Sequence, residues 1–180
     1  MSDEMGGLYA MNGRKWLNNW GPVMLWAGLI FWSSSQPYSE QDIRPLLSEK
    51  LDLQWVTQYL GHISFVYNTQ EISVTTLGEA GFLEFFIRKG AHLFAYFMLS
   101  VLTCRALGDW DRSSWMKGAV ALLVVSLYAV SDEFHQMFTA ERTPLVTDVL
   151  IDITGGFFGI IVYYVFQKIK NTWHQGHLSA

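Results

Sequence analysis

An apolar run, ALLVVSLYAV (121–130), passes without a turn residue into a group of polar side chains. These are Asp132, Glu133, His135 and Gln136. Carboxylates and imidazole can perform general acid–base chemistry, and they are also ligands that divalent metals take. An enzymatic reading of the sequence would therefore assign catalysis to these side chains together with one upstream histidine, as the set Asp132, Glu133, His135 and His92. No motif such as HExxH strengthens the metal reading.

Basic side chains accompany these acids and suggest a second kind of chemistry. Arg88, Lys89 and Arg142 could clamp a phosphate or carboxylate group, because charge-assisted hydrogen bonds to such anions are strong. The predicted binding set is Arg88, Lys89, Tyr96, Ser131, Gln136, Arg142, Asp148 and Asp152. The same charges could instead form buried ion pairs that only brace the fold.

The composition indicates which surroundings hold these groups. Hydrophobic residues make up 51% of the 180 residues and charged residues 16%, against about 25% charged in soluble domains. The net charge of −4 argues against a nucleic-acid partner, which would need a clustered basic surface. The lone Cys104 offers neither an internal disulfide nor a cysteine metal cluster.

Four apolar segments predict helices that cross a membrane. They are residues 16–32, 91–107, 115–130 and 149–166. A soluble bundle is the alternative, because short apolar runs also occur in soluble cores. However, the polar residues gather at one end of each segment, whereas a soluble helix carries a polar stripe along its whole length. The predicted fold is therefore all-α, a four-helix transmembrane bundle.

Lysine and arginine residues set the expected orientation. They precede the first segment, lie between the second and third, and follow the fourth, which places both termini in the cytoplasm. The predicted organisation is a cytoplasmic leader (1–15), one transmembrane domain (16–170) with an outer loop at about 35–83, and a cytoplasmic tail (171–180). Arg88 and Lys89 fall on the outer side, against the bias, so each is expected to have a local partner.

The outer loop and the helix faces carry further expectations. Residues 46–60 have the spacing of a short amphipathic helix, and residues 63–67 and 71–75 could pair as a hairpin. The topology brings the polar ends of all four helices to one membrane depth, where unpaired polar groups are costly and are functional candidates. Gly155 and Gly159 allow close helix approach.

Several of these motifs resemble the VanZ-like family of small bacterial membrane proteins. They are SSSQP (33–37), RKGAHLFAYFMLS (88–100), SDEFHQMF (131–138), ERTP (141–144) and DVLIDITGGFFG (148–159). The resemblance implies a multi-pass protein of the bacterial cytoplasmic membrane, in a family whose namesake is associated with teicoplanin resistance. The family pattern matches Lys89, His92, Tyr96, Ser131, Asp132, Glu133, Gln136, Arg142, Asp148 and Gly155 or Gly156. Asp152 stands where the family often has Asn.

Two functions follow as expectations. The favoured one is recognition of an anionic lipid or a lipid-linked headgroup by the outer cluster, with an effect on the cell envelope or on glycopeptide susceptibility. The alternative is a membrane-embedded hydrolase or transferase acting on a phospho- or polyprenyl-linked lipid. Expected partners are membrane lipids and lipid-linked cell-wall precursors, with no nucleic acid. No cofactor is expected for the binding protein, whereas the enzyme could use a divalent metal. A transporter has little support, because no inverted repeat is present.

Overall fold

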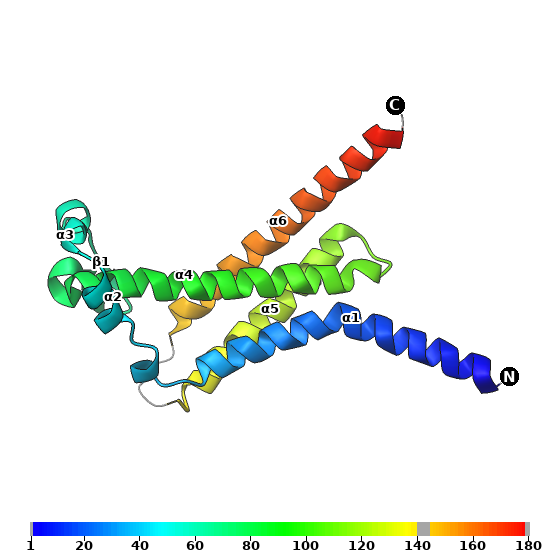
Figure 1. The fold of residues 1–180 in the computed structure, drawn as a ribbon, viewed down its shortest axis with the longest axis horizontal. Helices are drawn as coiled ribbons and strands as arrows, with labels where there is room; N and C mark the ends of the chain where they lie inside the picture. The colour runs from blue at the N-terminus through cyan, green and yellow to red at the C-terminus, as the bar shows by residue number, and fades with distance from the viewer. Residues whose placement is uncertain (1, 140–144, 179–180) are drawn as a thin grey trace.

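The computed structural model describes residues 2–139 and 145–178, with side chains described for residues 13–139 and 145–173. Four long helices dominate it: α1 (Ser2–Ser34), α4 (Val74–Ala106), α5 (Ser114–Gln136) and α6 (Val146–Leu178). Between α1 and α4 lie η1 (Tyr38–Glu40), α2 (Arg44–Lys50), α3 (Gln54–Leu60), β1 (Ser64–Tyr67) and β2 (Gln70–Ser73), and η2 (Leu107–Asp109) follows α4. Helix α4 contacts the other three long helices (Figure 1).

Three helices of the described chain are long and apolar enough to cross a membrane. They cover Val74–Asp109, Ser114–Gln136 and Val146–Trp173. The expected first span, residues 16–32, lies in α1, and the first half of this span is less apolar because it contains Asn18, Asn19 and Pro22. Composition therefore identifies three membrane helices, with α1 packed against α4 and α5.

Close contact between α4 and α6 depends on glycine. A Cβ atom at Gly155 would overlap the backbone carbonyl of Leu93, and one at Gly159 would overlap that of Phe97. The two glycines are four residues apart and so lie on one face of α6. The prediction of close helix approach is confirmed for this pair of helices.

The predicted outer loop is instead a folded unit, so the all-α, four-helix description was incomplete. We call residues 35–73 the cap. Strands β1 and β2 pair antiparallel, with Ser64 opposite Ser73, which confirms the hairpin. The predicted amphipathic helix is present as two short helices, α2 and α3. The cap has its own apolar core with the first turns of α4, formed by Leu53, Val56, Ile72, Val74 and Phe82.

The cap joins directly to α4. Ser73 caps the helix, because its side chain accepts a hydrogen bond from the Thr76 backbone N–H while the Thr76 side chain receives the Ser73 N–H. Gly78 then adopts a positive φ of 71° at a kink, a conformation that glycine tolerates without strain. The end of α1, the end of α5 and the start of α6 also lie at this cap end, while the start of α1 and the end of α6 lie at the far end (Figure 1).

Candidate functional site at the cap end

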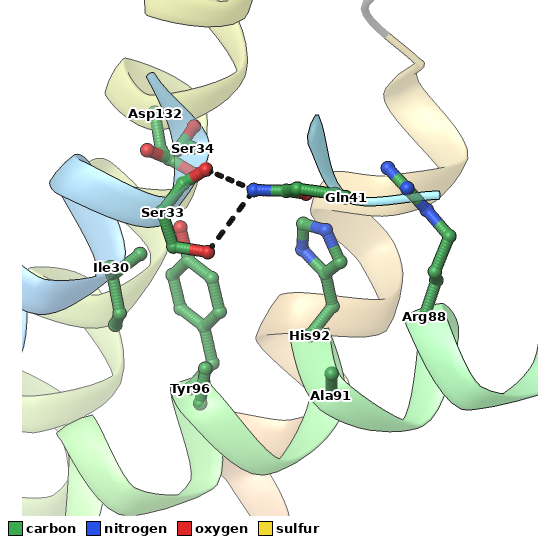
Figure 2. A pocket seen from close by; sticks show the side chains of 10 residues that line it. Ile30, Ser33, Ser34, Gln41, Arg88, Ala91, His92, Tyr96 and Asp132 are labelled. Carbon is green, nitrogen blue, oxygen red and sulfur yellow. Dashed lines mark hydrogen bonds between the residues drawn. The ribbon is translucent and has the colours of Figure 1, made fainter. Parts of the chain in front are cut away.

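A cavity of about 140 Å³ lies among the long helices at the cap end. We call it the helix cavity (Figure 2). Helix α1 contributes two serines, α4 a charged and aromatic face, and α5 one carboxylate. The polar and charged lining residues are Ser33, Ser34, Gln41, Arg88, His92, Tyr96 and Asp132. The polar ends of three predicted helices therefore meet around one space.

Three buried polar atoms of this cavity have no hydrogen-bond partner within the described residues. They are the Ser34 Oγ, the Tyr96 hydroxyl and the Asp132 Oδ1. Each comes from a different helix, and Figure 2 shows the Tyr96 ring pointing toward Ser34 and Asp132. Buried polar groups are nearly always paired in native proteins. This convergence therefore marks a place where water or a ligand group supplies the missing bonds.

Two cavity residues, Asp132 and His92, are each held by a neighbouring side chain. Gln136 donates its amide to the Asp132 Oδ2 at 3.3 Å. The His92 Nδ1 lies 3.4 Å from the Asp152 Oδ1, and Asp152 is only 1% exposed. Asp152 thus faces an imidazole across the α4–α6 interface.

A second cavity, of about 380 Å³, lies between the cap and α4. We call it the cap cavity. Arg88 lines both cavities. Its guanidinium lies 4.6 Å from the centre of the Tyr38 ring and 3.9 Å from Glu84 Oε1. Arg88 is therefore a cationic group at the junction of the two spaces.

The other oxygen of the Glu84 carboxylate, Oε2, has closer partners than Arg88. The Tyr38 hydroxyl donates to this oxygen at 2.8 Å, and the Arg44 Nε lies 3.5 Å from the same oxygen. Burial, and then this hydrogen bond to Glu84, raise the pKa of Tyr38 to about 12. A hydrogen bond and ion pair with Arg44 also hold the pKa of the cap residue Asp42 down at about 2. Arg44 thus serves two carboxylates.

Lys89 is engaged within the protein. Its ammonium lies 2.5 Å from the Asp148 Oδ1 and 4.8 Å from the centre of the Tyr67 ring. The Tyr67 hydroxyl donates to the same Asp148 oxygen. This pair ties the cap hairpin, α4 and the start of α6 together. It also gives Lys89 the local partner that was expected for it.

Other predicted site residues lie outside the helix cavity. The Glu133 carboxylate accepts a hydrogen bond from the Leu145 backbone N–H, which fixes the entry to α6. Ser131 is exposed and donates to its own helix at the Tyr128 carbonyl. Arg142 lies outside the described residues. The four candidate catalytic side chains are therefore divided, with only His92 and Asp132 lining the cavity.

His135 does not form an activated serine–histidine pair. Its Nε2 lies 3.1 Å from the Ser35 Oγ, and its ring packs on Phe31 with centroids 4.5 Å apart. However, the Ser35 hydroxyl donates its proton to the Phe31 carbonyl at 2.7 Å. The imidazole must then be the donor to Ser35, which is the reverse of general-base activation.

No three His, Cys, Asp or Glu side chains of the described chain are grouped so that they could hold a metal ion. The carboxylates of α5 point in different directions, because adjacent residues on a helix lie about 100° apart. Asp132 faces the cavity and Glu133 faces Leu145.

Sequence reasoning missed Glu84 and Tyr67. Glu84 stands four residues before Arg88, so the i, i+4 spacing of an acid and a base was a usable signal. Tyr67 meets Asp148 across 81 positions. Nothing in the local sequence marks that contact, because it depends on how the hairpin packs against α6.

The fold and the site together define a small multi-helix membrane protein with a polar cavity beneath a folded cap. The family model described as VanZ/LLP1 matches residues 20–167, which include all three membrane helices except the last turns of α6. The chain belongs to this family. No curated protein and no solved structure matches it.

Proposed function

We propose that this protein recognises the phosphate-bearing headgroup of an anionic lipid or a lipid-linked precursor at the cap end of its helices. In this proposal α1 is a fourth span, the cap lies outside the bacterial cytoplasmic membrane, and both termini are cytoplasmic. Occupancy of the site would alter the envelope or its susceptibility to glycopeptides.

The observation that carries the proposal is the position of Arg88. It lines both cavities, and its ion pair with the Glu84 Oε1 is long, at 3.9 Å. Tyr38 and Arg44 contact the other oxygen of this carboxylate, Oε2, at shorter distances. A guanidinium has five N–H donors, so Arg88 keeps donors for a bound anion. Lys89, by contrast, is engaged by Asp148 and contributes to the architecture.

The proposed orientation is supported by the arrangement of the helices. The start of α1 and the end of α6 lie at the same end, away from the cap (Figure 1). Cys104 is buried, so single cysteines can be introduced at exposed positions with little background. We expect Glu49→Cys in the cap to react with an impermeant maleimide in intact cells. Asp111→Cys, at the far end, should react only after permeabilisation, and the opposite pattern would overturn the orientation.

Headgroup recognition can be tested by native mass spectrometry of the purified protein titrated with phosphatidylglycerol and with diacylglycerol, which lacks the phosphate. We expect the wild type to retain phosphatidylglycerol and not diacylglycerol, and Arg88→Gln to lose this retention. The matched control is Arg112→Gln, which changes an exposed arginine beyond the far end of α4. Equal retention by wild type and Arg88→Gln would contradict the proposal.

A further inference from the structure

We propose that the headgroup bound at this site carries a primary ammonium group in addition to its phosphate, as a phosphoethanolamine ester does. This inference rests on the phosphate recognition proposed above, and its ammonium makes the expected headgroup zwitterionic rather than anionic. It concerns the part of the helix cavity opposite Arg88. Asp132, Ser34 and Tyr96 would bind the ammonium, and Arg88 would bind the phosphate.

The first support is the state of Asp132. The residue is 3% exposed. Its Oδ2 has the Gln136 amide at 3.3 Å, and its Oδ1 has no hydrogen bond among the described residues. Burying a carboxylate without a compensating charge is strongly unfavourable. A cationic ligand group would supply that charge.

The second support is that nearby cations face other carboxylates. The His92 Nδ1 faces Asp152 at 3.4 Å, and the Lys89 ammonium faces Asp148 at 2.5 Å. Arg88 lies over Tyr38 on the cap side. Within the described chain, no ion pair joins Asp132 to a basic side chain, and a ligand ammonium would supply such a cation.

The third support is the number of acceptors. The Asp132 Oδ1, the Ser34 Oγ and the Tyr96 hydroxyl oxygen are all buried, line one cavity and lack partners among the described residues. A primary ammonium has three N–H donors. It can donate one hydrogen bond to each of the three oxygens, in place of the interaction of the Ser34 and Tyr96 hydroxyls with the Asp132 carboxylate. A quaternary trimethylammonium has no donor to offer them, and a single hydroxyl has one.

The size of the cavity agrees with this assignment. About 140 Å³ is room for a few water molecules or a small headgroup, and it is too small for acyl chains. Arg88 and Asp132 stand on different sides of the space, with His92 between them (Figure 2). A phosphate and an ammonium joined by a short linker could reach both.

The test compares lipids that differ only in the headgroup. Purified full-length protein would be titrated with dioleoyl phosphatidylethanolamine, phosphatidylcholine and phosphatidylglycerol and analysed by native mass spectrometry. We expect phosphatidylethanolamine to bind at least about tenfold more tightly than phosphatidylcholine, as the loss of a charge-assisted hydrogen bond implies. Asp132→Asn should abolish this preference.

Controls separate recognition from folding. Tyr96→Phe removes one acceptor and keeps the ring, so a reduced preference in this variant would support the inference even if Asp132→Asn does not fold. Asp111→Asn, which neutralises an exposed acid, should leave the preference unchanged. Equal affinity of wild type for phosphatidylethanolamine and phosphatidylcholine would overturn the inference.

Failure of this inference is distinguishable from failure of the headgroup function. If phosphatidylglycerol binds as tightly as phosphatidylethanolamine and both are lost in Arg88→Gln, the ammonium inference fails and phosphate recognition stands. If no phospholipid is retained, both fail. Free phosphoethanolamine carries the same two groups. If free phosphoethanolamine displaces bound phosphatidylethanolamine, the ammonium inference is supported and the ligand can be a soluble ester. If phosphatidylethanolamine is preferred and is not displaced, the inference is supported and the ligand is a membrane lipid.

Discussion

The two ends of the helices both carry lysine–aspartate ion pairs, but the pairs differ in how far they are buried. At the far end, Lys15 lies 3.3 Å from Asp109, with both side chains more than half exposed, at 68% and 58%. At the cap end, Lys89 and Asp148 approach to 2.5 Å with exposures of 21% and 13%. Exposed pairs contribute little to stability, whereas removing one partner of a buried pair leaves an uncompensated charge. Burial at the cap end therefore makes each polar group depend on a specific partner.

This comparison also separates bracing from binding within the cap end. Lys89, Asp148 and Tyr67 satisfy one another. Ser34, Tyr96 and Asp132 keep buried atoms without partners in the described chain. The first group holds the cap on the helices, and the second group is where a ligand would change the balance of charge and hydrogen bonds.

The largest effect is expected in the cap core. Phe82 is fully buried there, and Phe82→Ala should lower the free energy of unfolding by about 3–5 kcal/mol. Phe166→Ala makes the same change at an exposed position of α6 and should have little effect. Thermal unfolding in detergent, with hydrogen exchange of residues 44–73, measures both. Equal behaviour of the two variants would mean that the cap has no core of its own.

A smaller loss is expected where α4 and α6 meet. Gly155→Ala places a methyl group against the Leu93 carbonyl, and overpacking against backbone should destabilise the protein by about 3 kcal/mol. Gly108→Ala adds the same atom at the far end, where nothing lies within 4 Å. The melting temperatures of the two variants test this point. An unchanged melting temperature for Gly155→Ala would rule out close packing of α4 against α6 at this position.

The buried ion pair should give the smallest of the three losses. Among the described side chains, Lys89→Ala leaves Asp148 only the Tyr67 hydroxyl. The substitution should cost about 2 kcal/mol, less than the loss of a fully buried pair, because both side chains keep some exposure. Lys15→Ala should change stability by less than about 1 kcal/mol. Equal losses of stability in Lys89→Ala and Lys15→Ala, with the same dependence on salt, would mean that the two ends do not differ as described.

The sequence predicted the parts of this molecule that follow from local pattern. Alternation around NTQ predicted the hairpin, and the spacing of Gly155 and Gly159 predicted close helix approach. The positive-inside bias predicted that Arg88 and Lys89 need local partners, because it marked them as exceptions.

Sequence pattern could not predict features that depend on packing across long separations. The cap core needs α3, β2 and α4 to meet, and nothing in residues 35–73 alone shows that they do. The division between Asp132 and Glu133 also escaped sequence reasoning. Neighbours on a helix point about 100° apart, but which of them faces the cavity depends on the rotation of α5 against α1 and α4.

A structure of the protein in nanodiscs of bacterial polar lipids tests the central difference between the two ends most directly. We predict headgroup density in the helix cavity, in contact with Arg88 and Asp132, with acyl chains leaving toward the bilayer. Only water in that cavity, together with an ordered headgroup at the Lys15 and Trp110 surface of the far end, would contradict the account.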